Sequence, residues 1–540
     1  MLKQASQKAL PFLIDALRPA KQLLPEYTRQ VPPARAMLLQ TFGVAAAALL
    51  GAIYGHYFAK LPPDYLLVLL APISVVALLV IWVLPDRDTA PTKALSRLLL
   101  AFFAVSIAWP DYLALQLPGL PWISFRRLFL LPTILVLLIC VSTNAAFRKD
   151  IRETLNAEPL IWKFLAGFVV MQFLSIAGAP SPAAAIKNFV NYQLAWTGIF
   201  FAATYVFRNI DIAQRFLKIF FMATMMVGLI AILETMNVGV LWRDHVPSFL
   251  QVDLETMTGT MSSAMRNGLY RAKSVYGQPL PFAEIMAYST PVILYFIFTA
   301  KNLWAKIVLI GLDLLLVYVL TLPQSRLGMI GYLISHALFI GVWSGRIWLR
   351  NKYSLMGPMI TLSYPLAVIA LAGAVMTVGP LREKVMGGGD TLNSDQARKQ
   401  QKRSARNVIL GNPVIGHGPR QAANVLGFVA YGRVTLDNYF LWIALDYGLI
   451  GFGIYYGLFL IVIHRMFMIS IRDIDRNNNM ALVALTTFAS FVIIKAVLSE
   501  EDNHSMIFMM LGFAMAIIWR EKAKQAEAEP ATRQNPHFVR

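Results

Sequence analysis

Two segments of the chain, residues 237–282 and 379–438, hold cationic side chains that could bind an anion. The thirteen cationic residues are Arg243, Arg266, Arg271, Lys273, Arg382, Lys384, Arg398, Lys399, Lys402, Arg403, Arg406, Arg420 and Arg433. Arginine suits phosphate, because its planar guanidinium donates two parallel hydrogen bonds and stays charged. The segments therefore predict either a phosphate site or a surface attracted to anionic lipid headgroups or polymers.

Residues 394–411 are predicted to form a helix within the second segment. Ser394 or Asp395 can cap its first turn, and Gly411 followed by Pro413 can end it. Because this helix is rich in arginine and lysine, it is the element we expect to carry an anion site.

Arg398, Lys402 and Arg406 recur at four-residue intervals and share one face of this helix. Like charges at this spacing repel one another, so the arrangement costs stability unless an anion lies between them. Residues 412–419, Asn-Pro-Val-Ile-Gly-His-Gly-Pro, predict a rigid turn that glycine permits. We expect the helix and the turn to form a cradle for the polar part of a substrate.

The rest of the sequence is too apolar for a soluble protein. It has 57% hydrophobic and 14% charged residues over 540 positions, whereas soluble domains average about 25% charged residues. A soluble enzyme, a disordered chain and a fibre are therefore excluded. The single cysteine, Cys140, excludes an intrachain disulfide and a cysteine-based zinc site. The composition predicts an all-α, polytopic integral membrane helical bundle.

About fourteen apolar stretches are long enough to cross a bilayer, which takes about 20 residues. They are residues 37–58, 64–84, 98–116, 128–146, 161–178, 188–206, 215–236, 283–300, 304–322, 327–344, 355–378, 439–463, 480–498 and 505–519. The third is the weakest, because Trp109-Pro110-Asp111 interrupts it. Residues 323–326 predict a tight re-entry between two spans.

The lysine and arginine distribution predicts that both chain ends lie inside. Most cations of the short connections fall on the side of the N-terminus, and the short connections on the other side hold only Lys60, Arg126, Arg127, Lys187 and Arg326. The predicted organisation is an inner segment at 1–36, a transmembrane bundle at 37–378 with a long outer loop at 237–282, a larger outer loop at 379–438, transmembrane helices at 439–519 and an inner tail at 520–540.

Several short motifs, taken in order, resemble the O-antigen ligase and polymerase superfamily of bacterial envelope glycan enzymes. The larger outer loop carries an arginine-bearing helix, then N-P-x-x-G-x-G at residues 412–418, D-N-x-x-L at 437–441 and Gly-Leu-Ile-Gly at 448–451. Residues 271–282 resemble the family's first outer loop, and Ser325-Arg326 resembles its short Ser-Arg element. The resemblance covers roughly residues 160–520.

The resemblance implies a glycosyltransferase of the bacterial inner membrane with its active face in the periplasm. Its donor would be a glycan on undecaprenyl diphosphate, and its acceptor a hydroxyl group of a glycan or lipid. Negative charge grows on the diphosphate as the glycosidic bond breaks, and preorganised arginines would stabilise that charge without a metal or another cofactor. The resemblance also leaves room for a flippase and a chain-length regulator as partners, but not for nucleic acid.

The resemblance assigns Arg271 and Arg398 to the diphosphate. The residues expected to bind substrate are Arg326, Arg403, Arg406, Asn438, Gly416 and Gly418. Arg403 and Arg406 compete with Arg398 for its role, and Arg326 could instead mark the end of a helix.

Asp437 departs from the pattern of the family, because many members have histidine before the asparagine that is Asn438 here. Asp437 could accept the proton of the acceptor hydroxyl as a general base, or it could cap the helix that begins near Asn438. Both interpretations stay open. The change favours polymerisation of O-antigen or exopolysaccharide repeat units over ligation to lipid A–core or to protein.

A transporter of lipid-linked oligosaccharide is the alternative from another class. It would place polar sites near the bilayer midplane between related halves, whereas this sequence has few charges within its spans and no internal symmetry. A scaffold for envelope assembly also stays open, and it predicts that single arginine changes are tolerated.

Overall fold

The computed structural model describes residues 66–115, 123–252, 265–350 apart from 267, 353, 355–377, 390–430, 433–472 and 479–534, with scattered helical positions between 41 and 60. Met1–Leu69 and Leu70–Arg540 form separate units, of which the second holds the helical bundle. The predicted inner segment 1–36 lies outside the described residues.

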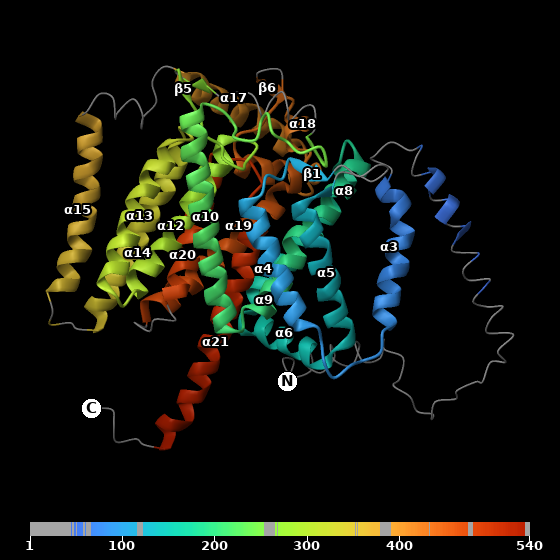
Figure 1. The fold of residues 1–540 in the computed structure, drawn as a ribbon. Helices are drawn as coiled ribbons and strands as arrows, with labels where there is room; N and C mark the ends of the chain where they lie inside the picture. The colour runs from blue at the N-terminus through green and yellow to red at the C-terminus, as the bar shows by residue number, and fades with distance from the viewer. Residues whose placement is uncertain are drawn as a thin grey trace. The chain divides into compact units, whose positions relative to one another are not determined.

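Helices dominate the described chain (Figure 1). The α-helices are α3 (Leu66–Val83), α4 (Thr92–Ala108), α5 (Phe125–Thr143), α6 (Ala145–Ala157), α7 (Pro159–Ser175), α8 (Pro182–Tyr192), α9 (Ile199–Val206), α10 (Ile210–Asn237), α12 (Pro279–Thr299), α13 (Leu303–Thr321), α14 (Arg326–Arg350), α15 (Met356–Thr377), α17 (Asp390–Gly411), α18 (Ala422–Leu426), α19 (Tyr439–Arg472), α20 (Asn479–Lys495) and α21 (His504–Gln534). A 3₁₀ turn, Ile176–Gly178, follows α7, and a π-helical stretch, Gln193–Gly198, joins α8 to α9.

The all-α membrane fold is confirmed. Each predicted apolar stretch from residue 64 onwards overlaps a helix, and seven of the described helices are long and apolar enough to cross a membrane. The count of fourteen and the inner position of both chain ends stay predictions.

Short strands stand beside the helices, at β1 (Leu113–Leu115), β2 (Ile123–Ser124), β3 (Leu250–Val252), β4 (Met265–Arg266), β5 (Leu269–Tyr270), β6 (Val429–Ala430) and β7 (Arg433–Val434). β1 lies between β2 and β3 in an antiparallel sheet, with Leu113 opposite Val252. This pairing joins the chain after α4 to the chain after α10. The predicted third span, 98–116, is wrong at its end, because α4 stops at Ala108 next to Pro110 and the chain then turns into β1.

Two further helix boundaries correct the sequence predictions. The helix expected at 394–411 begins at Asp390, so Ser394 and Asp395 lie inside α17 and do not cap it. The tail expected from residue 520 continues α21 as far as Gln534.

α12 is the central helix of the bundle. In its apolar stretch 83% of the residues are buried, against 44% or less in the other six candidate spans. It packs on α10, α13, α14 and α20. α17 and α18 lie at one end of the bundle, called here the α17 end, and α6 lies at the opposite α6 end (Figure 1).

Candidate functional site

Glu234, near the end of α10, fixes the segment that contains Arg271. Its carboxylate accepts hydrogen bonds from the Tyr270 hydroxyl at 2.5 Å and from the Ser274 backbone N–H at 2.5 Å. The Glu234 side chain is only 1% exposed, so a buried carboxylate is satisfied by the segment it holds. These hydrogen bonds hold the segment from Tyr270 to Ser274 in a fixed position against α10.

Arg271 is bound to the tight turn between α13 and α14. Its Nε donates to the Pro323 carbonyl oxygen at 3.1 Å, and the neighbouring Ala272 N–H donates to the Leu322 carbonyl oxygen at 3.1 Å. A tight turn lies where the sequence predicts one, and Arg326 is the first residue of α14 just beyond it. The fold thus brings Arg271 and Arg326 to the N-terminus of one helix, where the peptide dipoles favour an anion.

α17 packs through a face that is offset from its charged residues. Gln401, Ala405 and Ile409 are buried, and Arg398, one turn before Gln401, is half-buried. The residues Lys402, Arg403 and Arg406 are exposed. Arg398 is therefore the cation of this helix that lies nearest to its packed face.

Gln401 connects α17 to the segment before α19. Its amide nitrogen lies 3.5 Å from the Thr435 carbonyl oxygen, and its amide oxygen accepts from the Asp437 N–H at 3.2 Å. Residues three apart share a helix face, so Arg398 lies on the same face of α17 as Gln401. Gln401 in turn binds the backbone of Asp437.

Asn438, and not Asp437, caps α19. The Asn438 side-chain oxygen accepts from the Leu441 N–H at 3.1 Å, and the helix begins at Tyr439. The half-buried Asp437 carboxylate instead accepts from the Thr435 hydroxyl at 3.4 Å. The interpretation of Asp437 as a helix cap is therefore wrong.

The turn at residues 412–418 docks into an interruption of α19 at Gly448. Gly448 has φ 68° and ψ −178°, a conformation that is essentially restricted to glycine. The Leu449 N–H donates to the Pro413 carbonyl oxygen at 2.7 Å, and the Gly418 N–H donates to the Asp446 carbonyl oxygen at 2.9 Å. The unpaired backbone groups of the broken helix are thus satisfied by the turn.

Gly416 and Gly418 make this contact possible. Both have positive φ, 76° and 93°, and a Cβ atom on Gly416 would collide with the backbone of Asp446 and Gly448. The expected substrate cradle is therefore a packing contact in which the turn faces α19, and a role of either glycine in substrate binding stays a prediction.

Exchanging Gly448 for alanine is expected to destabilise the protein by about 2 kcal/mol or more. The added Cβ atom would lie 2.5 Å from the Val414 carbonyl oxygen and 2.7 Å from that of Pro413, and the backbone conformation itself costs about 1–3 kcal/mol for a non-glycine residue. Thermal unfolding in detergent measures the effect. Gly453→Ala is the matched control on the same helix, because a Cβ atom there meets nothing within 4 Å. Equal melting temperatures for the two variants would contradict the packing role.

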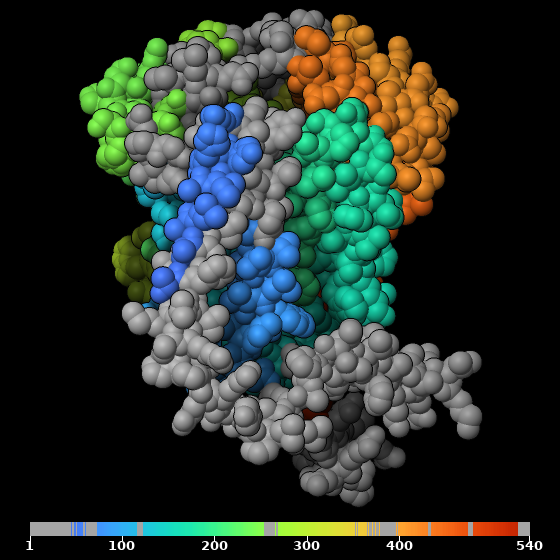
Figure 2. Space-filling model, turned by 90° about the vertical axis from the view of Figure 1, so that its right-hand side faces the viewer, coloured from blue at the N-terminus to red at the C-terminus, as the bar shows by residue number. Residues whose placement is uncertain are grey.

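The Asp446 side chain fixes residues 420–422, which follow the 412–418 turn. Its carboxylate accepts from the backbone N–H groups of Arg420 at 2.6 Å, Gln421 at 3.0 Å and Ala422 at 2.6 Å. Ala422 begins α18, so Asp446 satisfies the free amide groups of that helix start. Figure 2 shows the orange residues of this region above the teal residues of α8, in agreement with a contact of the Asn188 amide with the Pro419 carbonyl oxygen at 3.4 Å.

Glu501 joins α8 to the start of α19, a role that its acidic sequence context did not predict. Its two carboxylate oxygens accept from the Tyr192 hydroxyl at 2.7 Å and the Tyr439 hydroxyl at 3.1 Å. Glu501 also raises the pKa of the Arg420 guanidinium, with burial acting in the opposite direction. The turn at 500–504, which in isolation is indistinguishable from a solvated loop, is therefore part of the polar core at the α17 end.

The turn at 500–504 is in turn bound to α12. The Asn503 amide donates to Glu284 at 2.9 Å and to the Pro281 carbonyl oxygen at 3.0 Å. Glu284 forms an ion pair with Lys495 at 2.8 Å, and neither side chain is exposed. A buried ion pair needs further hydrogen bonds to offset its desolvation, and Lys495 also donates to the Glu500 carbonyl oxygen.

These hydrogen bonds and the short stretches of chain between them form one continuous path across the α17 end. It runs from the start of α12, which follows the Arg271 segment, through Asn503, Glu501 and Tyr439 to Asp437, and from there through Gln401 to α17. Arginines and a carboxylate from distant parts of the sequence are thereby held at one end of the bundle. Within the described residues, no group of three or more His, Cys, Asp or Glu side chains could hold a metal ion.

Glu500 is expected to make stability depend on pH. Burial raises the pKa of its carboxyl group to about 7, and the Asp502 carboxylate adds to the rise. The unfolded chain has a lower value, near 4.5, so the folded state binds the proton more tightly. The contribution of Glu500 to the free energy of unfolding is fully present below about pH 4.5 and is lost as pH rises to about 7. We expect a loss of about 1 kcal/mol after allowance for solvent screening.

Unfolding curves of the wild type and Glu500→Gln between pH 5 and pH 8 measure this effect. The variant carries a neutral side chain at every pH, so its stability should change less across the range. The same pH slope in both proteins would show that Glu500 does not titrate in this window.

Residues 311–456 match the model described as O-antigen ligase. No curated protein matches the chain. The matched range contains Arg326, all of α17, the 412–418 turn, Asp437 and the interruption of α19, whereas Arg271 and Glu501 lie outside it.

Proposed function

We propose that this multi-pass membrane protein is a member of the O-antigen ligase and polymerase superfamily and transfers a glycan from undecaprenyl diphosphate to an acceptor hydroxyl. The match of residues 311–456 to the O-antigen ligase model supports the proposal. The reaction takes place at the α17 end, which the charge distribution predicts to be periplasmic. Polymerisation of O-antigen or exopolysaccharide repeat units is the proposed outcome, and ligation to lipid A–core or to protein is the alternative.

The observation that carries the proposal is the contact of Arg271 with the turn that precedes Arg326. The Arg271 guanidinium binds the Pro323 carbonyl oxygen there, and Arg326 opens α14 three residues further on. Guanidinium groups and a helix N-terminus both favour a diphosphate. Arg398, held near Asp437 through Gln401, is the third cation of the proposed site.

In the proposed reaction the acceptor hydroxyl attacks the anomeric carbon of the donor sugar. The new glycosidic bond forms as the bond to the diphosphate oxygen breaks, and the electron pair leaves with undecaprenyl diphosphate. Arg271, Arg326 and Arg398 stabilise the growing negative charge, and Asp437 takes the hydroxyl proton. Arg403 and Arg406 remain proposed contacts for outer parts of the glycan, consistent with their exposure.

The test is the length of glycan on undecaprenyl diphosphate in cells that lack the protein, measured by lipid extraction and mass spectrometry. Accumulated single repeat units support a polymerase, and accumulated long lipid-linked chains support a ligase. Normal lengths together with normal surface glycan overturn the proposal. Transfer by purified protein in detergent, where no second compartment exists, separates an enzyme from a transporter.

A further inference from the structure

A cavity of about 630 Å³ lies at the α6 end, away from the site described above. It is bounded by the first turns of α4 and α10, by the end of α9 and by Asp150 of α6. The charge distribution of the sequence predicts that this end faces the cytoplasm. None of the proposed glycosyl-transfer steps uses it.

Three cations at the rim of this cavity have no counter-ion among the residues that the structure describes. Lys93 and Arg97 lie one turn apart on α4, and Arg215 lies on α10. All three are exposed, and no hydrogen bond or ion pair joins their side chains to the described residues. Like charges four residues apart on a helix destabilise it, so the rim favours an anion.

The fourth cation of the cavity is already compensated. Arg208 forms ion pairs with Asp150 at 2.9 Å and Glu153 at 3.6 Å, and its guanidinium lies over the Trp519 ring at 4.1 Å. Among the described residues that line the cavity, Asp150 is the only acid, and Arg208 engages it. No described acid compensates the charges of Lys93, Arg97 and Arg215.

The remaining lining suits an amphiphile. Apolar side chains of Leu100, Val206 and Ile212 stand beside polar groups of Ser96 and Asn209. Asn209 caps α10 by accepting from the Asp211 and Ile212 N–H groups at 2.9 and 3.2 Å, and the partial positive charge of this helix start adds to the field of the cations.

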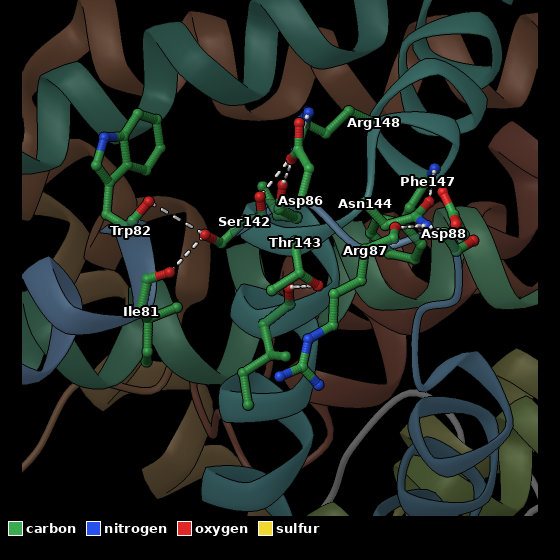
Figure 3. A network of polar contacts seen from close by, with 12 residues as sticks. Ile81, Trp82, Asp86, Arg87, Asp88, Ser142, Thr143, Asn144, Phe147 and Arg148 are labelled. Atoms are coloured by element: carbon green, nitrogen blue, oxygen red, sulfur yellow. Dashed lines mark hydrogen bonds and ion pairs between the residues drawn. The ribbon is translucent and has the colours of Figure 1, made fainter. Parts of the chain in front are cut away.

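The wall formed by α4 is held rigidly. Figure 3 shows the connection from α3 to α4 bound to the boundary of α5 and α6. The Asn144 amide donates to the carbonyl oxygens of Arg87 and Asp88 at 2.9 and 3.1 Å, and Arg148 pairs with Asp86 at 3.2 Å. Because α4 begins four residues after Asp88, these bonds fix the start of the helix that carries Lys93 and Arg97.

We propose that this cavity binds a phosphate group through Lys93, Arg97 and Arg215. An anionic phospholipid headgroup of the adjacent leaflet and free phosphate share this chemistry. The apolar lining beside the cations fits a lipid whose chain continues along the bundle, as basic pockets between transmembrane helices bind anionic headgroups.

The experiment uses the full-length protein in a zwitterionic detergent and follows its melting temperature. Dioleoylphosphatidylglycerol and, separately, inorganic phosphate are titrated, and dioleoylphosphatidylcholine is the uncharged comparison. The test variant is Lys93→Gln/Arg97→Gln/Arg215→Gln. The control variant, Arg152→Gln/Lys301→Gln/Lys522→Gln, removes the same charge from exposed positions that do not line the cavity.

Phosphatidylglycerol is expected to raise the melting temperature of the wild type and of the control. The phosphatidylglycerol concentration that gives half of the maximal rise in melting temperature should increase on the order of a hundredfold in the test variant. The reason is that each cation contributes about a fivefold gain in affinity. A shift with inorganic phosphate alone that the test variant loses supports the same site with a soluble ligand. Equal responses of the test and control variants to both probes overturn the proposal.

Discussion

Arg271→Gln is expected to reduce glycosyl transfer by about 10²–10³-fold, the effect of removing one preorganised donor from a developing negative charge. The Nε bond to the Pro323 carbonyl oxygen holds the guanidinium in one orientation at the start of α14. Glutamine keeps a polar side chain of moderate length but removes the charge. The measurement is transfer from a lipid diphosphate donor by purified protein.

The control for this change is Arg243→Gln, because Arg243 belongs to the same outer segment and its side chain is exposed. It should keep activity close to that of the wild type. Arg271→Lys separates charge from geometry: lysine restores a point charge but not the planar pair of donors, so partial activity is expected. Full activity of Arg271→Gln at normal protein levels would favour the scaffold hypothesis.

Asp437→Asn is expected to lower the rate of transfer by about 10²–10⁴-fold, the usual contribution of a general base. Asparagine has nearly the same shape but does not accept the proton of the acceptor hydroxyl. The bond from the Asp437 N–H to Gln401 is a backbone bond and remains. The cap of α19 also remains, because Asn438 provides it. The melting temperature should therefore stay close to that of the wild type.

Two comparisons make this result specific. Asp244→Asn removes an exposed acid of the first outer segment and should leave the rate unchanged. Asn438→Ala removes the cap and should cost about 1 kcal/mol of stability. A variant Asp437→Asn that is fully active, or that loses stability as Asn438→Ala does, would rule out the role of a base.

The distances of the polar path explain why these residues need one another. Glu501 has both carboxylate oxygens occupied by tyrosine hydroxyls, so it positions the start of α19 and is a poor proton acceptor. Asp437 lies two residues from Tyr439 and accepts only one weak hydrogen bond among the described residues. Of the two carboxylates, Asp437 is the one available to an acceptor hydroxyl.

The amino-acid sequence by itself determined the membrane-embedded helical class, the positions of the apolar helices and the tight turn before Arg326. These features depend on local properties, namely the length of apolar stretches and the presence of proline or glycine. The helix that carries Arg398 was also predictable, although its start was misplaced by four residues. The resemblance over short motifs pointed to the same family as the O-antigen ligase model, which matches residues 311–456.

The tertiary structure alone decided which residues meet. Arg271 and Pro323 are separated by 52 positions, and Tyr192 and Glu501 by 309. It also gave Gly416 and Gly418 a packing role against the interrupted helix and gave the cap of α19 to Asn438. Such contacts depend on how helices with similar apolar surfaces pack, and periodicity along the chain carries no information about that choice. Burial then separates a polar residue that is structural from one that can react, because a buried group must be satisfied by partners from elsewhere in the chain.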